Sequence, residues 1–266
     1  MSRILHLSDP HFGTVDPGLV EPFLDLAHRL KPDLCVISGD LTQRARTGQF
    51  QAARDFVTRL PRPVLIVPGN HDMPLDILPL RLLAPFAGFR RAFGPETEPQ
   101  VRLPDAVAQG VNTANPLVWK AGRLRAASLS RLTRAFAAAP VGHWRVVVMH
   151  HAPVPAADGT PPDIADPART LAALAATGAD IVLSGHTHMP HTGFAETAAG
   201  VLFLQVGTAI STRLKTGTND VALVTLGTGQ VTVESWLSPS GAAGFSPGPA
   251  LTYARPKAVW QKLPNP

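Results

Sequence analysis

Five short, mostly apolar runs in this chain lead into histidine, aspartate or asparagine, and this pattern restricts the folds that the chain can adopt. The clearest case is the run 179–183, which leads into Gly185-His186-Thr187-His188. Because residues two apart in an extended chain point the same way, one strand end can direct both imidazoles toward one place. The other four segments share this position: Asp9-Pro10-His11, Gly39-Asp40, Gly69-Asn70-His71-Asp72 and His150-His151. Since α/β sheets place ligands at such strand ends, we predict one site for a pair of divalent metals.

The spacing of apolar residues predicts alternating strands and helices in the early part of the chain. Strands are expected at 4–7, 34–38, 64–67, 107–111, 145–149, 181–184, 201–206, 221–226 and 231–236. Helices are expected at 17–30, 47–60, 128–138 and 167–177. Only turns separate the last three strands, so we predict that these three form an antiparallel meander, with a hairpin at 227–229. Two packed sheets flanked by helices would accommodate this order.

The length of 266 residues fits one large domain, which we place at 1–237. The remaining segment, 238–266, is rich in proline and glycine and is expected to be a tail, not a separate domain, that packs irregularly or is mobile. Five prolines mark the segment 73–100 as an insert beside the site. This insert is expected to shape a substrate pocket.

Hydropathy, cysteine count and net charge indicate where the protein is located and which kinds of partner it binds. No stretch approaches the roughly 18–20 apolar residues that span a bilayer, and the first residues read as a strand instead of a signal peptide, so we expect a cytoplasmic protein. A single cysteine excludes an internal disulfide. The net charge of +5 favours anionic partners, but no basic groove interleaved with aromatic residues points to nucleic acid. The oligomeric state stays open, and a homodimer is compatible with the sequence.

In their order and spacing, the five segments resemble the motifs of the calcineurin-like metallophosphoesterase family, and the resemblance runs from residue 4 to about 236. It implies an α/β fold, a four-layer α-β-β-α sandwich of two mixed sheets, with two divalent ions at the strand ends. Mn, Fe, Co and Zn are the candidates, because neutral imidazoles suit them better than Mg or Ca. One ion would take Asp9, His11 and His188, the other would take Asn70, His150 and His186, and Asp40 would bridge both.

The resemblance also implies a catalytic role for His71. In the family this position lies near the leaving-group oxygen and the phosphate, so our hypothesis is that His71 gives a proton or hydrogen bond to the departing oxygen. Three further residues are candidates for substrate binding: Arg44, Asn112 and His191. For each of them a structural or solvent-facing role is an open alternative. His151 and Asp72 are expected to support the site without binding metal.

The local sequences around Asp9 and Asp40 resemble those of a compact bacterial branch of the family. They read Ser8-Asp9-Pro10-His11-Phe12 and Ser38-Gly39-Asp40-Leu41-Thr42. That branch contains class III cyclic nucleotide phosphodiesterases and glycerophosphodiesterases. We therefore predict a hydrolase that cleaves a small phosphodiester by attack of a metal-bridging hydroxide, with a 3′,5′-cyclic nucleotide as the leading candidate. The segment after Asp40 and the Asp at position 72 depart from the protein Ser/Thr phosphatase pattern.

Three alternatives remain open at this stage. The first is a pyrophosphate hydrolase of lipid biosynthesis acting on a UDP-2,3-diacylglucosamine-type substrate, with 75–93 as an apolar lid for acyl chains. The familiar bacterial enzymes of that kind carry arginine where this chain has His71. The second is a DNA nuclease, which the basic charge permits. The third belongs to a different class and is a non-catalytic, metal-binding scaffold on the same fold.

Overall fold

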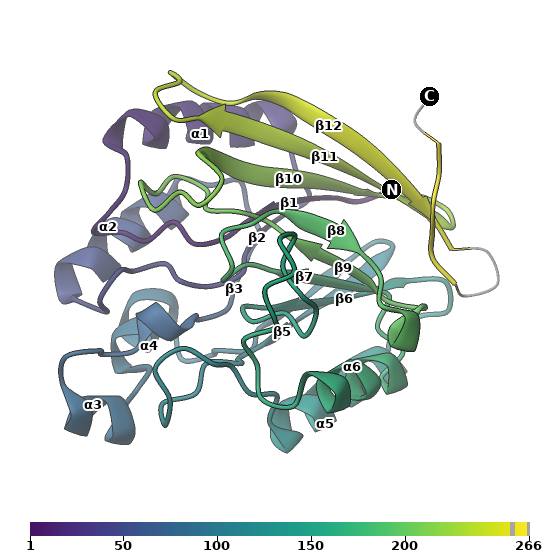
Figure 1. The fold of residues 1–266 in the computed structure, drawn as a ribbon, viewed down its shortest axis with the longest axis horizontal. Helices are drawn as coiled ribbons and strands as arrows, with labels where there is room; N and C mark the ends of the chain where they lie inside the picture. Colours follow the sequence, from purple (N-terminus) through teal and green to yellow (C-terminus); the bar gives the residue numbers. More distant parts are fainter. Residues whose placement is uncertain (256–258, 265–266) are drawn as a thin grey trace.

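Two mixed β-sheets pack face to face in the computed structural model, which describes residues 1–255 and 259–264 (Figure 1). The first sheet has the order β13 (Gln261–Lys262), β12 (Ser246–Ala254), β11 (Gln230–Pro239), β10 (Thr218–Leu226), β1 (Arg3–Leu7), β2 (Leu34–Ile37), β3 (Val64–Ile66). The second has the order β4 (Gln100–Leu103), β5 (Ala106–Val111), β6 (Trp144–Met149), β7 (Ile181–Ser184), β9 (Leu202–Gln205), β8 (His191–Gly193). The strands β1 to β3 are parallel to one another, as are β5, β6, β7 and β9.

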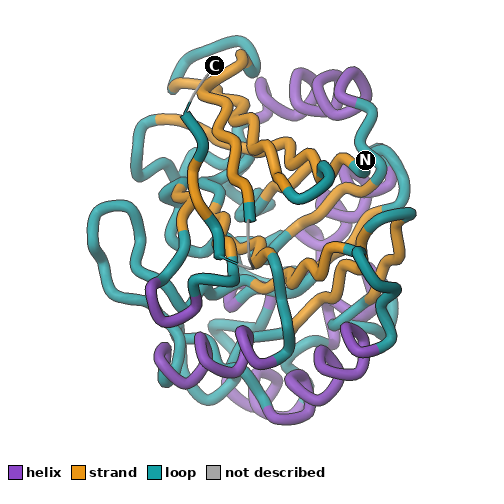
Figure 2. The backbone as a smooth tube through the Cα atoms, turned by 90° about the vertical axis from the view of Figure 1, so that its right-hand side faces the viewer, coloured by secondary structure: helices purple, strands orange, loops and turns teal. Residues whose placement is uncertain are grey.

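Helices cover the outer faces of both sheets, and Figure 2 shows the strands between the two groups of helices. The helices α1 (Pro17–Leu30) and α2 (Thr47–Thr58) pack on the first sheet. The helices α5 (Ala126–Ala137) and α6 (Pro167–Ala176) pack on the second. The start of α1 follows from local chemistry, because the Asp16 carboxylate accepts from the Gly18 N–H and Pro17 occupies the first turn. The predicted four-layer sandwich is confirmed.

The core between the two sheets explains why the strands read as continuous apolar runs. Ile4, Val36, Val146, Leu183 and Val224 all lie in this central layer and are fully buried. Helices bury the opposite faces of the sheets. Side chains that point to either face from β1, β2 and β7 are therefore shielded from water. The unbroken apolar runs end abruptly where the strands reach the edge of this core, and the polar candidate ligands begin there.

The predicted antiparallel meander is wrong in its first member. β9 lies in the second sheet, parallel to β7, with Leu202 opposite Ile181. All four residues of β9 are buried, which is the burial pattern of a central parallel strand. The meander instead consists of β10, β11 and β12, and β10 joins antiparallel to β1. The predicted hairpin at 227–229 connects β10 to β11 as expected.

The C-terminal segment is more regular than predicted. β12 pairs along β11, and the prolines within it are tolerated because β13 pairs only with Tyr253 and Ala254, leaving the rest of β12 as a sheet edge. Trp260 is 1% exposed and stacks on Trp144 at a ring distance of 5.6 Å. Its indole N–H donates to the carbonyls of Asp180 and Gly200. The expectation of an irregular or mobile tail is wrong for these residues.

The insert 73–100 contains two short helices that the sequence pattern did not predict, α3 (Leu78–Leu83) and α4 (Ala87–Phe93). Pro79 lies in the first turn of α3, where its missing N–H costs no helical hydrogen bond. Phe89 of α4 is fully buried in the core beneath α2. Within the described ranges, no helix combines the length and the hydropathy needed to cross a membrane.

Replacing Trp260 tests whether the C-terminal segment belongs to the core. Trp260→Ala is expected to lower the free energy of unfolding by about 3–5 kcal/mol, because it removes a buried indole that packs on Trp144. Urea denaturation followed by circular dichroism measures the change. The control Val259→Ala alters a half-exposed neighbour and should shift stability by no more than about 0.5 kcal/mol. An equally small loss for both variants would contradict the prediction.

Candidate metal centre

The seven candidate ligands lie at the carboxyl ends of five parallel strands drawn from both sheets. Asp9 and His11 follow β1, and Asp40 follows β2. Asn70 begins the short 3₁₀ helix η1 (Asn70–Asp72) after β3. His150 follows β6 directly, whereas His186 and His188 follow β7. The structure therefore brings together segments that are up to 179 positions apart in the chain.

Asp9, His11 and His188 form the first cluster. The His188 Nε2 lies 3.2 Å from the Asp9 Oδ1 and 3.0 Å from the His11 Nε2. The His11 Nε2 lies 3.6 Å from the Asp9 Oδ1. All three side chains are buried, and their ligand atoms fall within 4.8 Å of one another, as the donors around one cation do.

We call Asp40, His150 and His186 the second cluster. Its central member, His150, has its ligand atom within 4.8 Å of those of Asp9 and Asp40, and also of those of His151 and His186. The His150 Nε2 lies 3.3 Å from the Asp40 Oδ2 and 3.3 Å from the His186 Nδ1. The same Asp40 Oδ2 is 3.8 Å from the His11 Nε2 of the first cluster. Asp40 thus stands between the two groups. The buried Oδ1 of Asn70 has no hydrogen-bond partner among the described residues, and such an orphaned acceptor fits a cation ligand.

The outward nitrogen of three imidazoles is held by an acceptor, which directs the other nitrogen into the clusters. The His150 Nδ1 donates to the carbonyl of Ser38 at 2.8 Å, and the His188 Nδ1 donates to the carbonyl of Arg213 at 2.9 Å. The His186 Nε2 donates to the Asp163 Oδ2 at 3.1 Å. Metal-binding histidines are oriented in this way, because the acceptor selects the tautomer whose inward nitrogen carries a lone pair.

Backbone strain concentrates at the same residues. Of eight non-glycine residues with positive φ in the described chain, five are candidate ligands: Asp9, His11, Asp40, His186 and His188. Such backbone conformations are costly for non-glycine residues and cluster at functional sites. Two glycines permit the close packing, because a Cβ on Gly69 would collide with the Asp40 carboxylate and one on Gly185 would collide with Ser8 and Asp9.

The electrostatics of the site arise from two buried carboxylates. Burial alone would raise the pKa of Asp9 and of Asp40, but the surrounding histidines, above all His150, hold both pKa values well below the usual range. Conversely, burial would lower the pKa of His150, but Asp40 and Asp9 outweigh it and raise that pKa to about 9. Both carboxylates are therefore anions that need positive charge beside them, and bound cations would displace the proton on His150.

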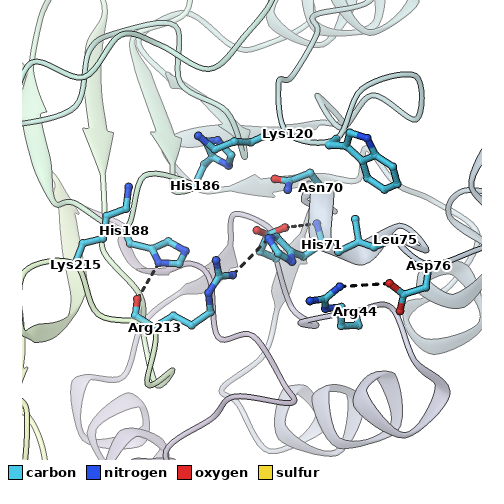
Figure 3. Close-up of a pocket in the computed structure, with 12 residues that line it drawn as sticks. Arg44, Asn70, His71, Leu75, Asp76, Lys120, His186, His188, Arg213 and Lys215 are labelled. Atoms are coloured by element: carbon cyan, nitrogen blue, oxygen red, sulfur yellow. Dashed lines mark hydrogen bonds and ion pairs between the residues drawn. The ribbon is translucent and has the colours of Figure 1, made fainter.

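His71 lies beside the clusters and faces the cavity above them (Figure 3). Its backbone N–H donates to the Asp40 Oδ1 at 2.8 Å, and its Nδ1 lies 2.8 Å from the carbonyl of Gln43. These two contacts leave the Nε2 free to point into the cavity, 3.4 Å from an Arg213 guanidinium nitrogen. The geometry fits a residue that contacts a substrate without occupying a metal position.

The cavity above the clusters measures about 520 Å³ and has a basic lining. Arg213 and Lys215 line one side, and Lys120 and Arg44 line others (Figure 3). Arg44, a predicted substrate contact, does line the cavity, where it also pairs with Asp76 at 3.3 Å. Four basic side chains around one opening favour an anionic ligand.

The two other predicted substrate contacts are not brought to this cavity. The Asn112 side chain turns back and accepts from the Ala114 N–H at 3.0 Å, so it caps its own loop after β5. His191 starts the edge strand β8, opposite Gln205, and lies outside the cavity lining. The strand end before Asn112 and the short distance in sequence from His188 to His191 suggest the site, but the local backbone directs both side chains elsewhere.

His151 and Asp72 have the supporting roles expected of them. His151 lies near His150 and His186, yet its Nδ1 is 2.8 Å from the Thr113 hydroxyl and its Nε2 is 2.8 Å from the Lys120 carbonyl. Both of its ring nitrogens are thus engaged outside the clusters. The Asp72 carboxylate accepts from backbone N–H groups of Leu41, Thr42 and Gly69, which joins the loops that follow β2 and β3.

Sequence reasoning missed Asp163, which orients His186. Its carboxylate also pairs with the Lys120 Nζ at 2.8 Å, and the hydrogen bond from His186, followed by that from Lys120, lowers the pKa of Asp163 despite partial burial. Asp163 lies in the long loop between β6 and α6, where no apolar run or motif marks it. Arg213 differs, because it follows the apolar run of β9 and is open as a candidate on that ground; the fold brings its guanidinium to 3.4 Å from the His71 Nε2.

Comparison with known proteins places this geometry in a family. The family model for calcineurin-like phosphoesterases matches residues 2–190, which span most of the chain and contain all seven candidate ligands and His71. The chain belongs to the calcineurin-like phosphoesterase family. The fold agrees with solved structures: the purple acid phosphatase PPD1 of yellow lupin (TM-score 0.65, 12% identity, 94% of this chain and 53% of that chain) and Vps29 of Chaetomium thermophilum (TM-score 0.52, 13% identity, 96% and 98%).

Two curated relatives of this phosphoesterase chain are more similar in sequence over shorter stretches. The glycerophosphodiester phosphodiesterase GpdQ of Enterobacter lignolyticus is 34% identical over 98 residues, which are 32% of this chain and 35% of that protein. A protein of Synechococcus sp., named a probable cyclic nucleotide phosphodiesterase, is 33% identical over 72 residues, which are 27% and 28% of the two chains. The matches thus span about a third of the length of these relatives.

Replacing Asp163, whose carboxylate accepts from the His186 Nε2, tests how the phosphoesterase chain orients its imidazoles. Asp163→Asn is expected to weaken divalent-metal binding roughly 10- to 100-fold, because the amide accepts the His186 proton less well than the carboxylate does. Titration calorimetry of the metal-free protein with Mn²⁺ measures this loss. Asp158→Asn is the control, since Asp158 is exposed in the same loop and contacts Thr160. Equal affinities for both variants would remove Asp163 from the metal centre.

Proposed function

We propose that the chain is a metal-dependent phosphodiesterase that hydrolyses a small anionic phosphodiester with two divalent ions. The observation that supports this most is the pair of neighbouring buried clusters, with Asp40 between them, that open onto a basic cavity. Asp9, His11 and His188 would hold one ion, Asn70, His150 and His186 the other, and Asp40 both. When bound, such ions would neutralise phosphoryl oxygens and acidify a water for attack on phosphorus.

The chain's own residues would bind and protonate the substrate. Arg213, Lys215 and Lys120 line the cavity and attract the phosphodiester anion. The carbonyl of Gln43 accepts the Nδ1 proton of His71, so the Nε2 faces the cavity. We propose that the Nε2, when it carries a proton, gives that proton to the leaving oxygen, because a departing alkoxide requires one to leave as an alcohol. The Asp40 Oδ1 accepts from the backbone N–H of His71 and so fixes the position of that residue.

The leading substrate candidate from the sequence, a 3′,5′-cyclic nucleotide, remains a candidate within this proposal. The names of the two curated relatives support a phosphodiester in general, since one is named for glycerophosphodiesters and the other for cyclic nucleotides. The exposed indole of Trp119 in the cavity lining offers a surface on which a nucleobase could stack. Cytoplasmic location and a bacterial source also remain proposals from the sequence.

Hydrolysis of bis(p-nitrophenyl) phosphate by metal-reconstituted protein tests the proposed function. We expect turnover with at least one of Mn²⁺, Co²⁺, Fe²⁺ or Zn²⁺ and no turnover after chelation, because the ions would acidify the attacking water and neutralise the phosphoryl oxygens. A panel of cyclic nucleotides, glycerophosphodiesters and a nucleotide-sugar lipid then orders the substrates. If no substrate were hydrolysed with any of the metals, despite measured metal binding, the result would favour the non-catalytic scaffold instead.

Removing His71 tests its assignment as the proton donor. His71→Ala is expected to lower kcat by roughly 10²- to 10⁴-fold while both metals stay bound, because the side chain contacts the cavity and not a metal position. Steady-state kinetics together with metal analysis of the purified variant separate the two effects. His28→Ala on α1 is the matched control, since that histidine is exposed and bonds to Arg59. Turnover of His71→Ala equal to that of the control would overturn the assignment.

A further inference from the structure

Helix α3 has an inverted distribution of polar and apolar side chains. Its only charged residue, Arg81, is 1% exposed, whereas Leu83 is 85% exposed. The leucines at positions 78, 80 and 82, and Ile77 just before the helix, are exposed as well. A surface helix of a soluble protein normally buries its leucines and leaves its arginine in water. This inversion calls for an apolar partner on the outer face of α3.

Arg81 joins α3 to a second apolar segment. Its guanidinium donates to the carbonyl of Pro116 at 3.0 Å and to that of Val118 at 2.5 Å, and it lies 4.8 Å from the ring centre of Trp119. This places the exposed side chains of Leu117, Val118 and Trp119 beside those of α3. We call the eight exposed apolar residues the apolar wall: Ile77, Leu78, Leu80, Leu82, Leu83, Leu117, Val118 and Trp119.

The apolar wall is a concentrated feature of the surface. Of twelve exposed large apolar side chains in the described part of the chain, eight belong to it. Scattered single residues of this kind are ordinary, whereas eight of them in two segments joined by Arg81 indicate a binding surface. The wall is also continuous with the candidate active site, because Trp119 and the neighbouring Leu75 line the same cavity as Asn70 and His71 (Figure 3).

The charges and the apolar surface together describe the ligand. Basic side chains surround the cavity, at Arg44, Lys120, Arg213 and Lys215, and would face an anionic phosphodiester. One member of the wall, Trp119, lines this cavity, and the other seven exposed apolar side chains lie on or beside α3, whereas Trp119 alone suffices for stacking a nucleobase. A molecule with an anionic head and an alkyl tail complements both parts.

We propose that this site takes amphiphilic phosphodiesters, in which one of the two alcohols carries a long alkyl or acyl chain that lies on the apolar wall. This inference rests on the proposed phosphodiesterase function and names its substrate class. Hydrolysis breaks the P–O bond to the other alcohol; water adds its hydroxyl to phosphorus and its proton goes to the leaving oxygen. The products are the phosphomonoester of the chain-bearing alcohol and the free second alcohol.

A homologous series of alkyl p-nitrophenyl phosphates, with methyl, butyl and octyl groups below their micellar concentrations, tests the inference on the metal-loaded protein. The reacting bond is the same throughout, so KM reports the tail alone. Each methylene that leaves water contributes on the order of a fourfold gain in affinity, so the wild-type KM should fall at least about tenfold from methyl to octyl.

Variants on the apolar wall connect that preference to its residues. In Leu83→Ser/Leu117→Ser the ratio of methyl to octyl KM should fall to within about threefold of unity, because two exposed contacts for the tail are lost. Both residues are exposed, so thermal melting should show an unchanged fold. The control Val141→Ser alters a fully exposed valine before β6, at the end of the sheet opposite the cavity, and should keep the wild-type ratio.

The outcomes separate the two proposals. Hydrolysis of all three esters with equal KM would overturn the amphiphile inference and leave the phosphodiesterase proposal standing. No hydrolysis of any ester with any metal would overturn the proposed function itself. A third outcome is a wild-type dimer in sedimentation that becomes monomeric in Leu83→Ser/Leu117→Ser with an unchanged chain-length ratio. That result would make the apolar wall an interface between copies and would also overturn the inference.

Discussion

Two buried carboxylates, Asp9 and Asp40, are the constraint on which the rest of the site depends. Each would be strongly unfavourable in a dry interior unless positive charge lay beside it. The histidines around them supply sites for such charge, either as protons, as on His150, or through the lone pairs of oriented imidazoles. Carbonyls and Asp163 hold the outward nitrogens, so the orientation is built into the fold before any ion arrives.

The strained backbone follows from the same constraint. Asp9, Asp40 and His186 adopt positive φ because the chain must turn sharply at the strand end and still aim each side chain back toward the junction of the sheets. Glycines at 69 and 185 remove the Cβ atoms that would keep these loops apart. The surrounding sandwich, with cores on both faces of each sheet, has the burial needed to hold such conformations.

Much of the fold was predictable because the central strands are buried on both faces and read as unbroken apolar runs. The same property misplaced β9, since a buried run does not say which sheet it joins. The helices α3 and α4 escaped prediction because prolines and outward-facing leucines obscure a helical period. Convergence of the candidate ligands could be foreseen from strand ends, whereas Asp163 and Lys120 could not, because loops carry no such rule.

Each cluster draws donors from both sheets: Asp9 and His11 from the first meet His188 from the second, and Asp40 from the first meets His150 from the second. A cation bound in either cluster would therefore link the two sheets across the core between them. Since ions held only by the native arrangement shift the folding equilibrium by mass action, thermal resistance of the molecule would rise with the free concentration of the ion. Availability of metal in the surroundings would thereby govern the fraction of chains that are folded.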